Sequence, residues 1–214
     1  MSPSPISRKL YHIVHVDRLP SIVADGRLLC DAEMAQRTGT GTIIGMSEIK
    51  ARRLVLPVKS HQGLNVGACV PFYFCPRSVM LYLIYQGNHP ELAYKGGQDP
   101  IVHLELDLHR VVKWAEDRKL RWAFTLSNAG SYYFEDRCDL KNLHEVNWQA
   151  VNAAQWSGTF KEGKQAEFLV EQQVAWDLVV RIGVLSRGIG QRTGAAIARA
   201  SHQPEIEIKR NWYY

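Results

Sequence analysis

The sequence predicts an α+β fold with a mostly antiparallel sheet. Short stretches with the alternation and composition of β-strands recur along the chain, and the helices expected between them are short. No regular succession of strand, helix and strand is present, which argues against a parallel sheet. The 214 residues, 46% of them hydrophobic, are enough for one domain with a sizeable core. We therefore expect a single domain over residues 1–214, with the polar, Pro- and Ser-rich residues 1–9 as a flexible tail.

The composition favours a polyanionic partner and a reducing compartment. The net charge is +5, and six Trp, nine Tyr and six Phe accompany it. Cations combined with aromatic rings are typical of grooves that bind single-stranded nucleic acid, and they are also common in ordinary cores. The four cysteines form no C-x-x-C pair, so we expect no metal site. The polar N-terminus and the lack of a long apolar run predict a cytoplasmic protein with free thiols and no membrane span.

The chain is predicted to begin with a strand and a short helix. Residues 10–16 alternate like a strand. Asp17 is placed to cap the helix that follows, and Gly26 is typical of its end. His12 and His15 are three residues apart, so they face opposite sides of a strand and are not expected to share a metal.

A loop and a basic helix are expected next. Residues 36–45 are rich in Gly and Thr and predict a flexible loop. Ser47 is placed to cap a helix that carries Arg52 and Arg53 and that Pro57 prevents from continuing. Two adjacent arginines on such a helix form a solvated face, or they belong to a segment that closes over a ligand and delivers an arginine to it.

The middle of the chain is predicted to combine strands with short helices. Strands are expected at residues 70–74, 101–106 and 121–125. Pro76 is expected to open a helix with Met80 on its apolar face. A second helix is predicted over residues 107–117 and a third from Ser127. A long polar excursion over residues 141–163 follows.

The C-terminal part is predicted to return to strands. One or two strands are expected within residues 174–184, and a final strand with a basic, aromatic end over residues 206–214. The glycines of residues 188–194 resemble a phosphate loop, but their spacing does not match a dinucleotide-binding fingerprint. We interpret this segment as a turn followed by a helix cap.

Residues 164–170 carry the most informative carboxylate. They alternate as a strand, with Ala166, Phe168 and Val170 on one face. Glu167 lies on the other face, where a carboxylate is costly unless it is paired or used. Two interpretations remain open: an edge strand with Glu167 in water, or a glutamate directed into a cleft to stabilise a developing positive charge. In the second case we expect Glu167→Ala to change the stability little, because the opposite face forms the core.

Five short segments occur in an order that resembles a known family. They are residues 11–15, 49–53, 70–80, 97–104 and 164–170. In this order and at these separations they resemble the DarT toxins, which are DNA-modifying ADP-ribosyltransferases. The resemblance extends from about residue 10 to residue 185.

The resemblance implies a fold, a reaction and a partner. The implied fold is the ADP-ribosyltransferase fold, with NAD as cosubstrate and single-stranded DNA as acceptor. The segment at residues 72–80 is more similar to the branch that modifies thymine than to the branch that modifies guanine. The family belongs to toxin–antitoxin pairs, so the resemblance also implies a DarG-type antitoxin with a macrodomain, and a block of DNA replication by the modified base.

The resemblance also implies roles for individual residues. Glu167 corresponds to the catalytic glutamate, and Arg53, rather than Arg52, to the arginine of the helix that closes over NAD. Further NAD contacts are implied at His12, Ile13, Val14, Ser21 and Leu29. Contacts with the acceptor are implied at Tyr73, Arg77, Met80 and Asn128. The family's loop histidine after residues 121–125 is missing, and Asn128 is the candidate to replace it.

Two other classes of function compete with this one. The first is transfer of ADP-ribose to guanine, RNA or protein, since nothing in the sequence distinguishes a ribose 2′-hydroxyl. The second is a single-stranded nucleic-acid-binding module without chemistry, which explains the positive charge and the aromatic residues. It does not explain a strand glutamate combined with a strand histidine and an arginine that follows a loop.

Overall fold

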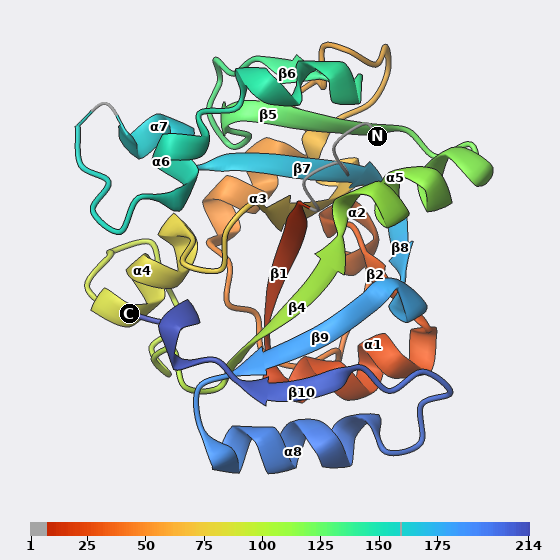
Figure 1. The fold of residues 1–214 in the computed structure, drawn as a ribbon, viewed down its shortest axis with the longest axis vertical. Coiled ribbons are helices and arrows are strands. Elements are labelled where there is room, and N and C mark those ends of the chain that lie inside the picture. The colour runs from red at the N-terminus through yellow and green to blue at the C-terminus, as the bar shows by residue number, and fades with distance from the viewer. Residues whose placement is uncertain (1–7, 159) are drawn as a thin grey trace, which may run out of the picture.

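The computed structural model describes residues 8–158 and 160–214 (Figure 1). Its strands are β1 Lys9–His15, β2 Arg27–Leu29, β3 Cys69–Tyr73, β4 Ile101–Asp107, β5 Trp122–Asn128, β6 Asp136–Arg137, β7 Ala166–Glu171, β8 Gln173–Ala175, β9 Val179–Val184 and β10 Glu205–Ile208. Eight of them form one sheet in the order β10-β9-β4-β1-β3-β7-β5-β6, and β2 pairs with β8 separately. All neighbours in the large sheet are antiparallel except β9 and β10. The predicted α+β fold is therefore confirmed.

Short helices cover the edges and faces of this sheet, as predicted. The α-helices are α1 Leu19–Asp25, α2 Asp31–Met34, α3 Ser47–Arg53, α4 Val79–Gln86, α5 Leu108–Asp117, α6 Trp148–Asn152, α7 Phe160–Gly163 and α8 Arg187–Ile197. The 3-10 helices are η1 Val16–Arg18, η2 Val66–Ala68, η3 Leu140–Glu145, η4 Trp176–Leu178 and η5 Arg210–Trp212. Within the described ranges no helix combines the length and the apolar character needed to cross a bilayer.

The large sheet divides between β1 and β3. Seven residue pairs join β1 to β4, whereas Tyr11 and Tyr73 form the one pair recorded between β1 and β3. In Figure 1, β5 and β7 run across the top of the molecule, while β1 and β4 run steeply below them. The strands on either side of this division diverge.

β7 lies inside the sheet and is buried on both faces. Its neighbours are β3 and β5. Ala166, Phe168 and Val170 join the main hydrophobic core, and Leu169 packs with Ala123 in a second cluster on the opposite face. The alternation predicted for this strand is confirmed. The interpretation as an exposed edge strand is wrong, because β5 continues the sheet beyond β7.

One part of the sheet is parallel, contrary to the sequence analysis. β9, α8 and β10 form a strand–helix–strand unit in which Ile206 pairs with Ile182. Residues 188–194 lie within α8 and do not form a turn. The Ser186 hydroxyl caps this helix by accepting the amide hydrogen of Ile189, and the buried Ile189 side chain anchors it. Cap and burial together outweigh the low helix propensity of its glycines.

The helix predicted from Ser127 is absent. Ser127 and Asn128 belong to β5, which continues past an irregularity in register so that Asn128 pairs with Ala166 of β7. Residues 129–134 form turns. Strand pairing with a central neighbour has overridden the local signal of a cap.

Several predicted element ends move by a few residues. Ser78, not Pro76, caps α4, and Ser47 is the first residue of α3 while Met46 occupies the cap position. Asp17 does not cap α1, because its carboxylate binds another segment. Lys9 belongs to β1, so the predicted tail over residues 1–9 is wrong at its end, and residues 1–7 lie outside the described residues.

Gly183 of β9 supports the C-terminal segment and gives a test of the fold. A Cβ atom at this position would lie 2.3 Å from two ring carbons of Trp212, whose indole covers the glycine. We expect Gly183→Ala to displace the ring and lower the free energy of unfolding by about 1–3 kcal/mol. Urea denaturation measures this change.

Gly188→Ala is the matched control for that substitution. Gly188 lies in α8 with no atom within 4 Å of its Cβ position, so alanine there should leave the stability unchanged or raise it by up to about 1 kcal/mol. Equal effects of the two substitutions would contradict the packing of Trp212 on β9.

Candidate active site

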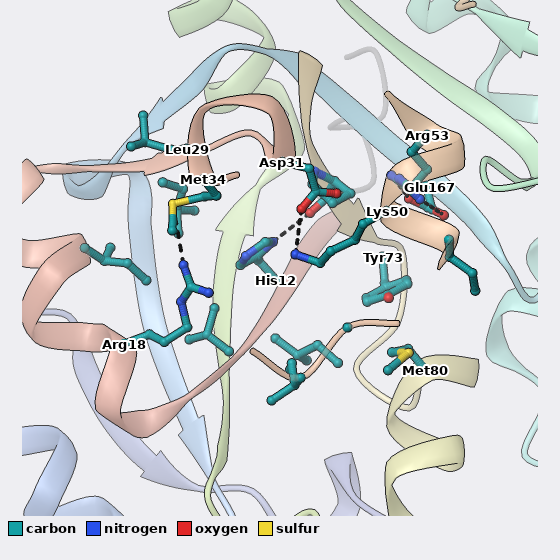
Figure 2. Close-up of a pocket in the computed structure, with 18 of the residues that line it drawn as sticks. His12, Arg18, Leu29, Asp31, Met34, Lys50, Arg53, Tyr73, Met80 and Glu167 are labelled. Atoms are coloured by element: carbon teal, nitrogen blue, oxygen red, sulfur yellow. Dashed lines mark hydrogen bonds and ion pairs between the residues drawn. The ribbon is translucent and has the colours of Figure 1, made fainter. Parts of the chain in front are cut away.

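A pocket opens where the sheet divides. It has about 1110 Å³ of empty space when the solvent at its open mouth is included. Its walls come from β1, α1, β2, α2, α3, β3, α4 and β7 and from the end of the loop before α3 (Figure 2). Nine of the residues implied by the family resemblance line it: His12, Ile13, Val14, Ser21, Leu29, Arg53, Tyr73, Met80 and Glu167.

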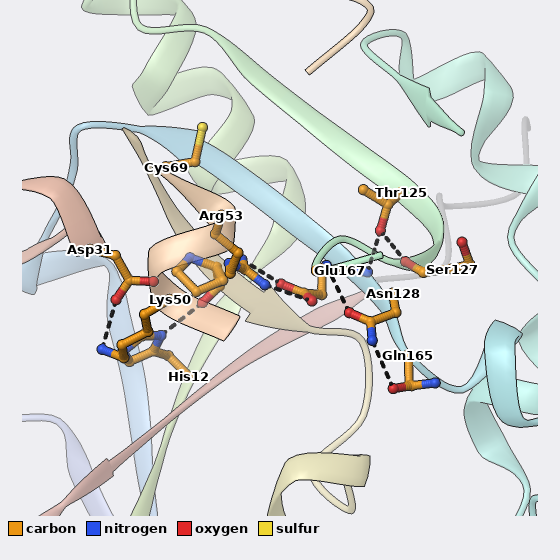
Figure 3. A network of polar contacts seen from close by, with 12 residues as sticks. His12, Asp31, Lys50, Arg53, Cys69, Thr125, Ser127, Asn128, Gln165 and Glu167 are labelled. Atoms are coloured by element: carbon orange, nitrogen blue, oxygen red, sulfur yellow. Dashed lines mark hydrogen bonds and ion pairs between the residues drawn. The ribbon is translucent and has the colours of Figure 1, made fainter. Parts of the chain in front are cut away.

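Glu167 and Arg53 form a buried ion pair on the wall of this pocket (Figures 2 and 3). Nη1 of Arg53 donates to Oε1 of Glu167 at 3.0 Å, and Nη2 donates to Oε2 at 2.8 Å. The side chains are only 8% and 7% exposed. Burial disfavours the charged guanidinium, but the Glu167 carboxylate outweighs burial and raises the pKa of Arg53 above its usual value. Of the two interpretations of Glu167, the structure shows the one in a cleft.

Neighbouring strands hold Glu167 in this position. Its backbone amide donates to the hydroxyl of Thr125 on β5 at 3.0 Å, and that hydroxyl donates to the Ser127 carbonyl at 2.6 Å (Figure 3). The irregular register of β5 therefore replaces a ladder hydrogen bond by a side-chain hydrogen bond beside the glutamate. On the other side, Tyr73 of β3 is the register partner of Glu167. Burial, and then the Glu167 charge, raise the pKa of the Tyr73 phenol.

Close packing and a second ion pair hold Arg53. Arg53 is the last residue of α3, whose end packs on η2. A Cβ atom at Gly67 of η2 would lie 2.7 Å from the Cα of Leu54, so this approach requires glycine. One turn before Arg53, Lys50 donates to the Asp31 carboxylate of α2 at 2.8 Å. These contacts fix α3 against η2 and against α2.

The loop before α3 is attached to η1, the short 3-10 helix that leads into α1. Thr42 donates from its amide at 2.9 Å and from its hydroxyl at 2.6 Å to the Asp17 carboxylate.

The two arginines of α3 have different partners. Arg52 lies over the ring of Tyr132, with its guanidinium carbon 5.3 Å from the ring centroid. Of the two arginines, the structure brings Arg53 to the carboxylate, in agreement with the residue chosen from the sequence.

His12 connects the two halves of the sheet. Its Nδ1 lies 2.7 Å from the Pro71 carbonyl of β3, so this nitrogen carries the hydrogen and donates it. In the neutral ring Nε2 is then a hydrogen-bond acceptor. Burial, with a contribution from the Arg18 charge, lowers the pKa of His12 to about 4 against the Pro71 hydrogen bond. His12 is therefore neutral at physiological pH.

Arg77 and Asn128 lie outside the wall of the pocket. The Arg77 guanidinium lies 4.3 Å from the ring centroid of Tyr214. The Asn128 side chain accepts from the Gly130 amide at 2.8 Å and donates to Gln165 at 3.2 Å (Figure 3). The structure thus explains Asn128 as a support for the turn after β5, and its contact with a substrate remains a prediction.

Sequence reasoning missed part of the pocket. The lining residues that it did not single out include Arg18, Asp31, Met34, Ile44, Met46, Ile49 and Lys50. Lys50 has a signal in the sequence, because it lies one turn before Arg53 on the same face of a helix. No signal in the sequence marks Arg18 and Asp31, because they reach the pocket only when α1 and α2 fold back against β1.

The arrangement suits chemistry in which positive charge develops next to a fixed carboxylate. Glu167 is oriented by its backbone and by Arg53 in a site with little water, which is the condition for strong electrostatic stabilisation of a transition state. His12 supplies a neutral acceptor on the facing strand. The described part of the chain contains no cluster of three or more His, Cys, Asp and Glu side chains that could hold a metal ion.

Known proteins share both the sequence and the fold of this chain. A Thermus aquaticus protein named DNA ADP-ribosyl transferase is 35% identical over 214 residues, covering 98% of this chain and 90% of the relative. A Thermus sp. 2.9 DarT solved in complex with ADP-ribosylated ssDNA has a TM-score of 0.88 and 32% identity, covering 98% of each chain. Thermus sp. 2.9 DarT in complex with NAD+ has a TM-score of 0.81 and 31% identity, covering 98% of this chain and 99% of that one.

The fold, the pocket and these relatives define a DNA ADP-ribosyltransferase. The family model described as "ssDNA thymidine ADP-ribosyltransferase, DarT" matches residues 11–214. The chain belongs to this DarT family, as the sequence resemblance indicated. The alternative of a binding module without chemistry is thereby set aside.

The buried ion pair changes one expectation about stability. A glutamate that only lined a cleft could be removed at little cost, but Glu167→Ala leaves the Arg53 guanidinium buried without its counter-charge. We now expect Glu167→Ala to lower the free energy of unfolding by about 3–5 kcal/mol.

A double substitution tests that explanation. Arg53→Met combined with Glu167→Leu removes both charges, and we expect the double variant to recover most of the lost stability. A double-mutant cycle from urea denaturation measures the coupling free energy. Additive effects of the two single substitutions would show that the pair contributes no interaction of its own.

The neutral state of His12 predicts a dependence of stability on pH. The pKa is about 4 in the folded protein, below the usual value of 6.5, so the unfolded chain takes up a proton between these values that the folded protein does not. The stabilisation from neutral His12 is complete above about pH 6.5 and is lost as the pH falls toward 4, by at most about 3 kcal/mol.

His12→Gln isolates this contribution. His103 is also buried with a pKa lowered to about 4 and remains in the variant, so the difference between the two proteins reports on His12 alone. We expect the free energy of unfolding, measured in urea, to fall less steeply from pH 7 to pH 4.5 in the variant. Parallel curves would show that the pKa of His12 is the same in the folded and the unfolded protein.

Proposed function

We propose that this protein transfers ADP-ribose from NAD to a thymine base in single-stranded DNA, within a particular sequence context. The observation that carries the proposal is the buried pair of Glu167 and Arg53 on the wall of the pocket, with the neutral His12 on a neighbouring part of the same wall. The solved Thermus relatives, one in complex with NAD+ and one with ADP-ribosylated ssDNA, support the two substrates. The family description supports thymidine as the acceptor.

Glu167 acts on the donor sugar in this proposal. NAD supplies an ADP-ribose group whose glycosidic bond breaks with its electron pair leaving on nicotinamide. The Glu167 carboxylate stabilises the positive charge that develops on the ribose, as carboxylates do in glycoside hydrolysis. Arg53 fixes both oxygens of this carboxylate through two charge-assisted hydrogen bonds. A new bond then forms to a ring nitrogen of thymine, and the proton of that nitrogen goes to water.

The remaining pocket residues position the substrates. His12 accepts a hydrogen bond from a ribose hydroxyl through Nε2, since Nδ1 is held by Pro71. Ile13, Val14, Ser21 and Leu29 contact the rest of the donor. Tyr73 and Met80 lie on the same wall as Glu167 and form an apolar contact for the acceptor base.

The acceptor is proposed to be single-stranded because a base must be unstacked to enter such a pocket. Arg77 and Asn128 lie beyond the pocket wall, so in this proposal they contact neighbouring nucleotides rather than the reacting base. The net charge of +5 favours binding of the DNA backbone.

The biological setting follows from the family. We propose that the protein is a toxin of the cytoplasm whose product blocks DNA replication. Its proposed partner is a DarG-type antitoxin, whose macrodomain removes the modification.

Transfer of a label from NAD tests the reaction and its acceptor. With adenylate-labelled NAD we expect label on single-stranded oligonucleotides that contain thymine, and much less on thymine-free strands, duplex DNA, RNA and protein. Glu167→Gln should lower kcat by about 10²–10³, because an oriented charge is lost from the transition state.

The control for that assay is a folded, binding-competent variant. Glu167→Gln should be assayed well below its melting temperature and should still bind single-stranded DNA within about threefold of wild type, since in this proposal the carboxylate acts on the donor sugar and not on the DNA. Label found only on guanine, RNA or protein would show that thymine in single-stranded DNA is not the acceptor. Near-normal transfer by folded Glu167→Gln would contradict the catalytic role.

A further inference from the structure

The carboxylates that line the pocket are already matched by cations. The matched pairs are Glu167 with Arg53, Asp31 with Lys50, and Asp25 with Arg37. In the first pair both terminal nitrogens of the guanidinium are engaged by the carboxylate. These three cations are therefore not free to bind an anionic ligand without breaking an ion pair.

Arg18 also lines the pocket, and it has no carboxylate partner among the described residues. Its Nη2 donates at 3.5 Å to the Met34 sulfur, which is a weak acceptor. Its Nε is buried and has no hydrogen-bond partner among the described residues. The adjacent Asp17 carboxylate is engaged by Thr42 and His15 instead. The guanidinium is thus a half-buried cation whose donors are largely unused.

Such a cation attracts anions into the pocket. Burial lowers the pKa of Arg18 below its usual value although Asp17 and Asp31 oppose the change, so the charged form is incompletely stabilised by its surroundings. The Arg18 charge also lowers the pKa of His12, which shows that its field reaches the middle of the pocket. A ligand anion that paired with Arg18 would supply the missing stabilisation.

We propose that Arg18 binds the diphosphate of NAD and thereby positions the donor against Glu167. The inference rests on the proposed function of the site. Figure 2 shows Arg18 and Glu167 on opposite sides of the pocket with His12 between them. The diphosphate of the donor is separated from the reacting carbon by a ribose, so an anchor across the pocket from the carboxylate suits its length. A guanidinium fork matches two phosphate oxygens in geometry as well as charge.

Met34 explains why Arg18 can serve in this way. A thioether holds the guanidinium in place through a weak contact, and a phosphate oxygen replaces that contact easily. By contrast, a ligand anion would have to compete with a carboxylate for Arg53 or Lys50. Arg18 is accordingly a positioning residue, and Glu167 remains the catalytic one.

Ligand binding by Arg18→Met separates this role from a structural one. We expect the affinity for NAD and for ADP-ribose to fall by roughly tenfold to a hundredfold, the contribution of hydrogen bonds to a charged group. Nicotinamide, which lacks phosphate, should bind as to wild type. The melting temperature without ligand should stay the same or rise, because an incompletely paired buried charge is removed. In turnover, KM for NAD should rise with little change in kcat.

Two further variants complete the test. Arg18→Lys keeps the charge without the fork and should restore part of the NAD affinity. Arg110→Ala removes an exposed arginine of α5 outside the pocket, and should leave both binding and KM unchanged if the effect is local. Should Arg18→Met fail to fold, Arg18→Gln replaces it with the same expectation.

The outcomes distinguish this inference from the proposed function. If wild type binds NAD and modifies DNA while Arg18→Met or Arg18→Gln binds NAD within threefold of wild type, Arg18 does not hold the diphosphate. A parallel loss of nicotinamide binding, or a fall of several degrees in the melting temperature with unchanged NAD affinity, would assign Arg18 to the fold. If wild type does not bind NAD, the proposed function itself is contradicted.

Discussion

The buried ion pair between Glu167 and Arg53 constrains the rest of this structure. It joins residues 114 positions apart in the sequence, one on a central strand and one at the end of a short helix. A pair with this little exposure is stable only if both charges stay aligned, because a lone buried charge costs several kcal/mol. The surroundings supply that alignment through the Thr125 hydroxyl, the close approach at Gly67 and the second ion pair of Lys50. The result is a carboxylate oriented before any ligand arrives, at a cost in stability that the core must offset.

The division of the sheet follows from the same requirement. A continuous ladder between β1 and β3 would fill the space in front of Glu167 with backbone, whereas a single residue pair leaves a pocket there. His12 compensates for the missing ladder by bonding to the Pro71 carbonyl across the gap. That contact holds the two half-sheets together and also sets which ring nitrogen can accept a hydrogen from a ligand. In the proposed function, one imidazole therefore makes a structural hydrogen bond through Nδ1 and accepts a hydrogen bond from the substrate through Nε2.

The sequence predicts those features of the fold and the site that depend on local periodicity. It does not predict the features that depend on tertiary contacts. The alternation of residues 164–170 placed Glu167 on the correct face, and the choice of Arg53 over Arg52 agrees with the geometry. The ion pair itself could not be foreseen, because no local signal says that α3 approaches β7 closely. The same limit explains the absent helix at Ser127, where pairing with β7 decided the conformation, and the parallel unit around α8. Arg18 was missed because the role proposed for it depends on its having no carboxylate partner among the described residues, which only the tertiary contacts reveal.

In the proposed reaction, the distribution of charge in the pocket favours the transition state over the ground state. At rest Arg53 neutralises Glu167 as seen from a distance, so the carboxylate does not attract solution cations into the site. Within contact distance the two charges are no longer equivalent, because a group that touches the free side of the carboxylate is nearer to the negative charge than to the positive one. A positive charge that develops there is stabilised, while a neutral sugar gains little. In the proposed reaction two tasks are thus separated: Arg18, which has no carboxylate partner among the described residues, holds the anionic donor, and the Glu167–Arg53 pair stabilises the transition state in which the glycosidic bond breaks.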